Sequence, residues 1–264
     1  MIDLAHVDRL IRDVAQDVIL PRFRNLKAGE VRTKSSARDF VTIADEEAEK
    51  RLTAELTALL PGSCVVGEEG VAADKSVLER LRGDDPVWIV DPVDGTANFT
   101  DGNPAFGVMV ALVKGGETLA GWIHDPLGQR TAMAMKGKGA WLEGQRLTVL
   151  APCPVHEMTG AIYSKRTLNR LAEAVKKRRC TSCAAFDYLG TLTGLSHFVL
   201  FTRLMPWDHA PGVLIHAEAG GFSMLTDGRV YVPLPMEGVL IAASDEASWT
   251  AVKDLVDSST GGTI

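Results

Sequence analysis

Two carboxylates that follow a short apolar run are the residues whose types and spacing point most directly to chemistry. Residues 87–90 have the composition of a buried strand, and the run ends at Asp91 and Asp94, with Pro92 between them. Proline prevents the strand from continuing, so both carboxylates converge on one small volume at its carboxyl end. Without compensation they would repel each other, and one would hold a proton. A divalent cation keeps both ionised, and an all-oxygen ligand set favours Mg²⁺, Mn²⁺ or Ca²⁺ over zinc.

The residues that follow these carboxylates form a candidate site for an anion. Gly95 and Thr96 are small, and glycine permits a tight turn. If a helix starts here, its first backbone N–H groups point outward and can hold a negatively charged group. A cation site beside an anion site predicts chemistry on a phosphate.

Three further motifs accompany this central one. Gly67-Glu68-Glu69 precedes it, and Trp207-Asp208, with Ala217-Glu218-Ala219-Gly220-Gly221, follows it. The weakest motif comprises Lys34, Ser35, Ser36, Asp39, Phe40-Val41-Thr42 and Asp45. Together with the run W-I-V-D-P-V-D-G-T-A-N-F at 88–99, these motifs resemble those of the inositol monophosphatase family, and they occur in the family's order between about residues 34 and 221.

The resemblance implies a fold, a cofactor and an activity. Members of this family are Mg²⁺-dependent, lithium-sensitive phosphomonoesterases with an α/β fold, a five-layer αβαβα sandwich of the sugar-phosphatase type. It implies a homodimer with two Mg²⁺ ions per subunit and a weaker third ion beside Glu68. Glu68, Asp91 and the backbone carbonyl of Val93 would hold the first ion, and Asp91, Asp94 and Asp208 the second.

The resemblance also implies roles in catalysis. Thr96, oriented by Asp45, would act with Glu68 to position the attacking water and help remove its proton. The N–H groups of Gly95 and Thr96 would hold phosphate oxygens. A second water near Asp208 would protonate the leaving group, and no covalent intermediate would be needed.

Substrate identity is less closely defined. An ungapped alignment from the tryptophan–aspartate motif places the family's substrate-contacting positions on Ser182, Cys183, Ala184 and Phe201. The resemblance implies that Asp94 contacts the substrate as well. Phe201 falls where the family has a glutamate, and phenylalanine cannot accept hydrogen bonds from inositol hydroxyls. The resemblance predicts inositol monophosphate as the substrate. Histidinol phosphate, fructose 1,6-bisphosphate and 3′(2′),5′-bisphosphate nucleotides are alternatives on the same fold.

Structural explanations remain open for several of these residues. Thr42 and Asp45 have the spacing of a helix capping box, and Asp208 fits a helix N-cap. Glu68 can belong to a solvated turn, and Lys34 can be a surface lysine.

Cysteines and histidines show no catalytic or metal-binding spacing. Cys180-Thr-Ser-Cys183 lacks a second pair or a nearby histidine, so we interpret this C-x-x-C as a chance occurrence. His209 and His216 are expected to be packing or surface residues. Neither an H-E-x-x-H motif nor a G-x-S-x-G nucleophile elbow occurs.

Two other classes of protein compete with this interpretation. A haloacid dehalogenase-type phosphatase also has Asp-Gly-Thr after a strand, but as D-x-D-G-T near the N-terminus, with a covalent aspartyl-phosphate. Here the spacing is Asp91-x-x-Asp94, about a third of the way along the chain. The second class is a regulatory binding protein, since some members of the resembling family are reported to act on RNA or transcription complexes.

Composition limits the class of protein. The chain has 264 residues, 46% of them apolar, a formal charge of −6 and four cysteines. This length allows one large or two small domains, and the charge argues against a general nucleic-acid binder. The cysteines do not form a disulfide framework, and no apolar run approaches the ~20 residues of a membrane span. A reduced, cytoplasmic protein without a membrane segment is the expectation.

The elements that must position these residues follow from periodicity and turn residues. A boundary near 151–154 divides an N-terminal α+β subdomain (1–150), which carries most metal ligands, from a C-terminal α/β subdomain (151–264) with Asp208 and the substrate pocket. Helices are predicted at 3–27, with a break at Pro21, and from Thr42 to about 60; strands at 64–66, 106–113, 119–124, 131–135 and 145–149, the last four as an antiparallel meander. The second half is predicted to contain strands at 160–163, 196–204, 222–225 and 239–243 and helices at 167–178, 208–218 and 246–257, with the basic cluster 176–179 at a helix end.

Overall fold

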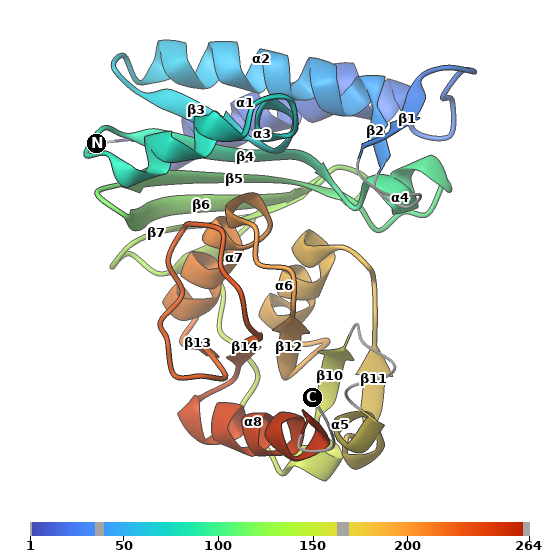
Figure 1. Cartoon of the computed structure of the whole chain (residues 1–264), viewed down its shortest axis with the longest axis vertical. Coiled ribbons are helices and arrows are strands. Elements are labelled where there is room, and N and C mark those ends of the chain that lie inside the picture. The colour runs from blue at the N-terminus through green and yellow to red at the C-terminus, as the bar shows by residue number, and fades with distance from the viewer. Residues whose placement is uncertain (1, 35–39, 163–168, 261–264) are drawn as a thin grey trace.

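The chain forms alternating layers of helices and sheets (Figure 1). The structure, a computed structural model, describes residues 2–34, 40–162 and 169–260. A seven-stranded and a five-stranded sheet lie between three layers of helices, which confirms the predicted αβαβα sandwich. Ser35, Ser36 and Asp39 of the first motif lie outside the described residues.

One outer layer consists of α1 (Leu4–Val14) and α2 (Ile43–Leu59). The apolar stripe of α1 is buried, and helical structure continues through a π-helical segment to a 3-10 turn at Leu20–Arg22, where Pro21 lies. Between the two helices, β1 (Val31–Thr33) and β2 (Phe40–Thr42) pair antiparallel. Both helices pack on the large sheet, whose core contains Trp88 and Trp122.

The seven-stranded sheet has the strand order β3-β4-β5-β6-β7-β8-β9. Its strands are β3 (Cys64–Gly67), β4 (Val87–Asp94), β5 (Gly107–Lys114), β6 (Glu117–Asp125), β7 (Arg130–Met135), β8 (Ala140–Leu142) and β9 (Gln145–Arg146). β3 and β4 are parallel and all other pairs are antiparallel, so the predicted meander is confirmed for β5–β7.

The last strand of the meander was predicted wrongly. Residues 145–149 do not form one strand, since β9 ends at Arg146. β9 pairs only with β8, in a short hairpin whose turn residues Glu143 and Gly144 both have positive φ. After β9 the chain leaves the sheet, and the N–H of Val149 donates to the carbonyl of Ala219 instead. Apolar composition alone did not separate this segment from a sheet strand.

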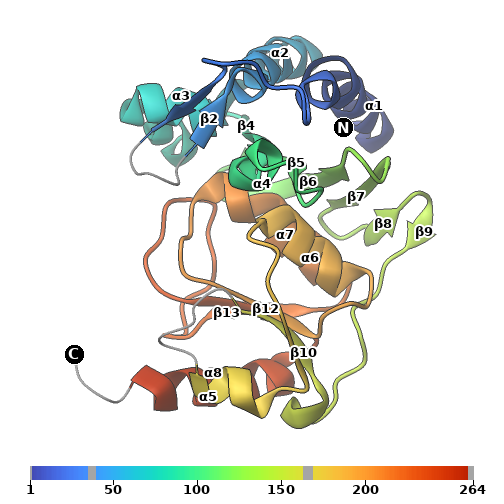
Figure 2. The ribbon, with the colours of Figure 1, turned by 90° about the vertical axis from the view of Figure 1, so that its right-hand side faces the viewer.

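The middle layer contains α6 (Ala184–Leu192) and α7 (Pro206–Glu218), which lie between the two sheets (Figure 2). α7 approaches β6 closely at Gly121, where an added Cβ would lie 2.8 Å from Cα of Pro211. α7 begins at Pro206, after Met205 as N-cap, so the interpretation of Asp208 as an N-cap is wrong. Proline suits the first helical position, and Asp208 therefore falls within the first turn.

The five-stranded sheet has the order β11-β10-β12-β14-β13, and its far face is covered by α5 (Asn169–Ala174) and α8 (Glu246–Thr260). Its strands are β10 (Thr159–Ile162), β11 (Lys177–Arg179), β12 (Phe198–Phe201), β13 (Phe222–Leu225) and β14 (Leu240–Ala243). The predicted helix at 167–178 is therefore wrong at its C-terminal end. Lys177–Arg179 form an edge strand parallel to β10, a position where charged side chains are common.

The predicted boundary falls between the strands of the two sheets. Strands of the large sheet end at Arg146, and those of the small sheet begin at Thr159. The division into two subdomains stays a prediction, because α6 and α7 of the second half pack against the large sheet. No helix within the described ranges is long and apolar enough to cross a membrane.

Candidate active site

The carboxyl end of β4 brings two aspartates to the same side of the large sheet. Side chains alternate along a regular strand, so residues three apart would face opposite sides. Here Asp91 pairs with Met109 and Asp94 pairs with Gly107, so β4 has one more residue than β5 between these pairs. This β-bulge at Pro92 and Val93 turns both carboxylates toward one volume. The convergence expected from the sequence is thus produced by an irregularity in the strand.

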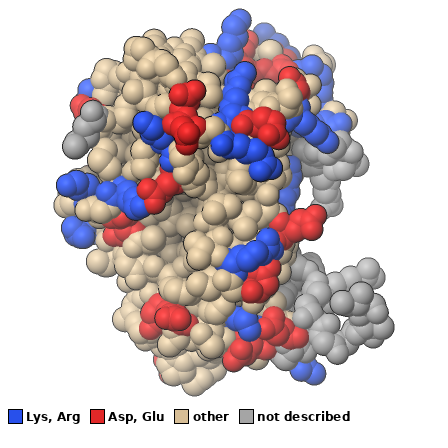
Figure 3. Space-filling view, turned by 60° about the vertical axis from the view of Figure 1, so that its left-hand side comes forward, with Lys and Arg blue, Asp and Glu red and all other residues tan. Residues whose placement is uncertain are grey.

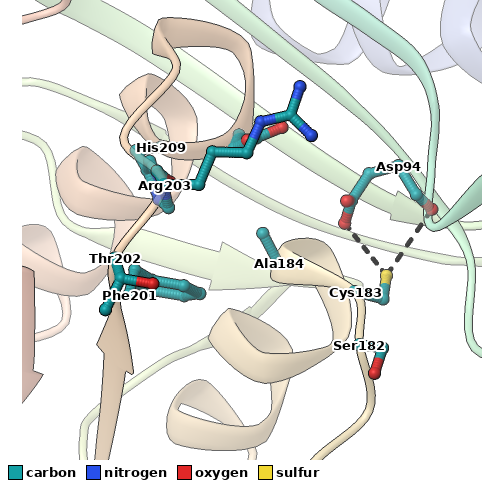
Figure 4. Close-up of a pocket in the computed structure, with 9 residues that line it drawn as sticks. Asp94, Ser182, Cys183, Ala184, Phe201, Thr202, Arg203 and His209 are labelled. Carbon is teal, nitrogen blue, oxygen red and sulfur yellow. Dashed lines mark hydrogen bonds between the residues drawn. The ribbon is translucent and has the colours of Figure 1, made fainter. Parts of the chain in front are cut away.

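Asp94 also fixes the start of α6. Its Oδ2 accepts a hydrogen bond from the thiol of Cys183 at 2.9 Å (Figure 4). The same oxygen accepts from the N–H of Ala185 at 2.6 Å. A carboxylate at a helix N-terminus satisfies a backbone donor that has no partner within the helix and complements the helix dipole. Asp94 therefore joins the large sheet to the middle helical layer.

Asp208 completes a cluster of three carboxylates. It extends from the first turn of α7, and one oxygen each of Asp91, Asp94 and Asp208 lies within 4.8 Å of the others. Burial, followed by repulsion from the neighbouring carboxylates, raises the pKa of Asp91 and of Asp208 well above the ordinary value. Burial also raises the pKa of Asp94, to about 6.

This cluster fits a divalent cation. Its donors are all carboxylate oxygens, which are the ligands preferred by Mg²⁺ and Ca²⁺. The three side chains take part in no ion pair with a lysine or arginine among the residues that the structure describes. A cation would offset the repulsion that raises their pKa values.

Thr96 lies beside the cluster and is held from behind by Asp45. Its Oγ1 is 3.0 Å from Oδ1 of Asp45 and 3.0 Å from the carbonyl oxygen of Val93. Asp45 also accepts from the N–H of Thr42 at 2.9 Å and from its hydroxyl, which completes a capping box at the start of α2. Asp45 is buried, and burial raises its pKa to about 6. Both interpretations of Asp45, as a capping residue and as a neighbour of Thr96, are therefore confirmed.

The turn between Asp94 and Thr96 requires glycine. Gly95 has φ +86° and precedes α4 (Thr96–Thr100), a single short turn of helix. A Cβ at this position would lie 2.9 Å from the carbonyl oxygen of Ala105 and 3.2 Å from Cβ of Cys183. Only glycine meets both conditions without strain.

Glu68 faces the same volume but is paired with a lysine. It is the first residue of α3 (Glu68–Ala73), and Lys34 Nζ donates to Glu68 at 2.9 Å and to Glu69 at 2.6 Å. Burial opposes the charge of Lys34, but Glu68 and Glu69 raise its pKa overall. Lys34 is thus a largely buried partner of the glutamates and not the surface lysine considered above.

Glu49, a residue that the sequence analysis missed, holds the α3 turn in place. Its carboxylate accepts from the N–H of Glu69 at 2.8 Å and from the N–H of Gly70 at 2.7 Å. Gly67 is needed here, because an added Cβ would lie 2.2 Å from the carboxylate carbon of Glu49. The sequence signal that could have identified Glu49 is its position four residues after Asp45, which places both side chains on the same face of α2.

Two cavities meet at the carboxylate cluster. The first, of 190 Å³, is lined by Glu68, Asp91, Val93, Asp94, Gly95, Thr96 and Asp208, among others, and we call it the carboxylate cavity. The second, of 270 Å³, is lined by Asp94, Ser182, Cys183, Ala184, Phe201, Thr202, Arg203, Asp208 and His209, and we call it the leaving-group cavity (Figure 4). The structure therefore brings together every site residue predicted from the sequence, with Asp45 behind Thr96.

Phe201 offers the leaving-group cavity an apolar wall. It ends β12, is 5% exposed, and packs against Tyr188 at 5.0 Å and His209 at 4.5 Å between ring centroids. Burial lowers the pKa of His209 to about 4, so its ring is neutral at pH 7. His216 is likewise buried, with a pKa lowered to about 4, so of the two expected roles, packing or surface, both histidines have the packing role.

The fold and this site together define a class of protein. An αβαβα sandwich with clustered carboxylates and a threonine–aspartate pair beside a small cavity is the arrangement that the sequence resemblance predicted for a phosphomonoesterase. The sequence model of the inositol monophosphatase family matches residues 3–259, so this chain belongs to that family.

Curated relatives support this assignment. The chain is 31% identical over 206 residues to a fructose-1,6-bisphosphatase/inositol-1-monophosphatase of Thermotoga maritima, and this match covers 76% of each of the two chains. It is 30% identical to an inositol-1-monophosphatase of Bacillus subtilis, covering 80% of this chain and 81% of the relative. Among solved structures, the Thermotoga maritima IMPase superposes with a TM-score of 0.84 at 27% identity, covering 97% of each chain. The chain is thus a phosphomonoesterase of this family.

Proposed function

We propose that this protein hydrolyses a small phosphomonoester with Mg²⁺, by attack of water and without a covalent intermediate. The observation that carries the proposal is the cluster of Asp91, Asp94 and Asp208, which adjoins the Thr96–Asp45 pair in one cavity. Two groups with different tasks thus lie side by side: one binds cations, and the other positions a water.

The cluster could hold two cations, with Asp91 as a ligand to both. Glu68, Asp91 and the carbonyl of Val93 would hold one ion, and Asp91, Asp94 and Asp208 the other, while a third position beside Glu68 is part of the same proposal. Such ions supply charge stabilisation and lower the pKa of coordinated water. In this structure Lys34 donates to both Glu68 and Glu69, and Glu68 would become available to a cation if Lys34 bonded to Glu69 alone.

The residues of the chain then place the reactants. The hydroxyl of Thr96 donates a hydrogen bond to Asp45, which leaves the Oγ1 lone pairs to orient the attacking water. Glu68 would remove a proton from that water. The N–H groups of Gly95 and Thr96 hold phosphate oxygens as the bond to the leaving group breaks. A water beside Asp208 returns a proton to the leaving oxygen.

Inositol monophosphate is the substrate that we propose to test first. The curated relatives in Thermotoga maritima and Bacillus subtilis carry inositol-1-monophosphatase in their names. Histidinol phosphate, fructose 1,6-bisphosphate and 3′(2′),5′-bisphosphate nucleotides are the alternatives, because apolar Phe201 offers inositol hydroxyls no acceptor.

A phosphate-release screen tests this proposal. The metal-stripped protein is assayed against these esters with Mg²⁺, with a chelator, and with Mg²⁺ plus Li⁺. We expect release of phosphate only with Mg²⁺ and inhibition by Li⁺. Hydrolysis that persists with the chelator, or no hydrolysis of any ester, would contradict the proposal. Light scattering in the same buffer tests the proposed homodimer, and cell fractionation tests its proposed cytoplasmic location.

A regulatory binding role is the second candidate. A Vibrio cholerae relative that is 31% identical over 231 residues is named Nus factor SuhB. On the face shown in Figure 3, however, acidic and basic side chains are interspersed. A catalytically silent protein that binds RNA or a transcription complex would favour this role, and a trapped aspartyl-phosphate would instead favour the haloacid dehalogenase mechanism.

A further inference from the structure

Arg203 is a cation at the active site to which the proposed mechanism gives no role. It lies in the connection between β12 and α7 and lines both the carboxylate cavity and the leaving-group cavity. Within the described part of the chain, its guanidinium takes part in no hydrogen bond or ion pair. Figure 4 shows this side chain on one side of the leaving-group cavity, with Asp94 and Cys183 on the other.

A hydrogen-bonded histidine holds the backbone of Arg203. Nε2 of His209 donates to the carbonyl oxygen of Arg203 at 2.8 Å, so Nδ1 carries no proton and accepts from the hydroxyl of Tyr188 at 3.2 Å. A carbonyl can only accept, and this fixes the tautomer of the neutral ring. The bonds lie in the core, where Tyr188 is fully buried. Arg203 therefore has an ordered backbone, and its guanidinium, whose charge partly opposes the rise in the pKa of nearby Asp208, donates no hydrogen bond to the described part of the chain.

The charges around the leaving-group cavity favour an anion next to Arg203. Its charged lining residues, all within the described chain, are Asp94, Asp208 and Arg203, because His209 is neutral. The two carboxylates belong to the proposed metal site, where bound cations would offset their charge. The positive charge of Arg203 then remains, beside the hydroxyl groups of Ser182 and Thr202.

We propose that Arg203 binds a second anionic group, a carboxylate or a phosphate, on the alcohol part of the substrate. A planar guanidinium donates paired hydrogen bonds to either group, whereas Phe201 at the cavity wall offers nothing to a neutral polyol. The protein therefore prefers phosphate esters of anionic alcohols to esters of neutral ones. This inference rests on the proposed phosphatase function and narrows its substrate class.

Two matched pairs of esters test the inference. Glycerol 2-phosphate and 2-phosphoglycerate differ by a carboxylate, and fructose 1-phosphate and fructose 1,6-bisphosphate differ by a phosphate. The measured quantity is the kcat/KM of the anionic ester divided by that of its neutral partner. We expect Arg203→Gln to lower this ratio by about 10- to 100-fold in at least one pair, mainly through KM. Loss in the first pair assigns a carboxylate, and loss in the second assigns a phosphate.

Control variants separate charge from geometry. Arg9→Gln removes the same charge from an exposed position on α1, outside the cavities, and should leave both ratios unchanged. Arg203→Lys keeps the charge without the paired donors and should give an intermediate ratio.

The outcomes distinguish this inference from the proposed function. Mg²⁺-dependent hydrolysis with no preference for anionic esters, or a ratio unchanged in Arg203→Gln, would overturn the inference and leave the phosphatase function standing. An equal loss for both members of a pair would assign Arg203 to the transferred phosphate, which also overturns it. If no ester is hydrolysed, the proposed function fails. Calorimetric binding of the same esters to Thr96→Ala, with and without Arg203→Gln, then decides the inference alone.

Discussion

Asp94 shows how a single side chain serves both the fold and the site. One oxygen accepts from Ala185 and Cys183 at the start of α6, and the carboxylate also belongs to the cluster with Asp91 and Asp208. The oxygen that caps the helix carries no requirement for charge, whereas cation binding does. These two tasks can therefore be separated by removing the charge and keeping the acceptor.

Asp94→Asn should leave the protein folded and reduce its metal affinity and turnover by at least about 100-fold. The amide oxygen can still accept from Ala185, but one negative charge of the cluster is lost. Calorimetric Mg²⁺ titration, circular dichroism and phosphate release measure the three effects. Asp84→Asn, at an exposed position, is the matched control. Near-normal activity of Asp94→Asn at low Mg²⁺ would remove this residue from the metal site.

Thr96→Ala should lower kcat by about 10²- to 10⁴-fold while metal affinity stays nearly constant. The hydroxyl contacts Asp45 and the carbonyl of Val93, and in the proposed mechanism it would orient a water without being a metal ligand. Thr96→Ser keeps the hydroxyl and should restore much of the rate. An unchanged kcat in Thr96→Ala would show that the hydroxyl has no part in the reaction.

At the scale of elements, the position of α3 depends on a contact between two parts of the chain. Glu49 of α2 accepts from the backbone of α3, and Gly67 leaves room for its carboxylate. α3 in turn carries Glu68 to the carboxylate cavity. A defect in this contact should affect stability and activity together.

Gly67→Ala should destabilise the protein by about 1–3 kcal/mol and lower its activity, because the new methyl group displaces Glu49. Urea unfolding and phosphate release measure both effects. Gly83→Ala is the control, since φ there is −87° and an added Cβ would meet its nearest neighbour at 3.7 Å. If the two alanine variants were equally stable and active, the Glu49 contact would not position α3.

At the scale of the whole molecule, buried neutral histidines make stability depend on pH. His216 is fully buried, and its pKa falls from an ordinary 6.5 to about 4 because burial disfavours the charged form. Between these values the unfolded chain binds a proton that the folded protein does not. Stability from this residue is therefore complete above pH 6.5 and is lost as the pH falls toward 4.

His216→Asn removes this dependence and so provides its measurement. The stability of the wild type relative to the variant should fall by about 1.6 kcal/mol between pH 6.5, where the unfolded histidine is already half protonated, and pH 5, since each pKa unit corresponds to about 1.4 kcal/mol. Urea unfolding of both proteins at the two pH values gives this difference. A difference that is constant with pH would show that His216 does not remain neutral in the folded protein.

Local sequence patterns predicted the parts of the site that depend on short-range structure. The Asp91–Asp94 run, the capping box of Asp45 and the alternation of strands and helices were all recognisable from spacing. Features that depend on long-range contacts could not be recognised in this way. Lys177–Arg179 pair with β10 at a sheet edge, and Glu49 accepts a hydrogen bond from the backbone of a residue twenty positions away. Arg203 was missed because no local pattern shows which arginine faces a cavity.

The central claim is that Asp91, Asp94 and Asp208 gather around hard cations that the reaction requires. Anomalous diffraction from crystals soaked with Mn²⁺, a scattering substitute for Mg²⁺, tests it most directly. We predict two peaks about 3.5–4 Å apart, with Asp91 contacting both. The claim would be contradicted if the protein hydrolysed phosphate esters but its soaked crystals showed no Mn²⁺ peak among these three carboxylates.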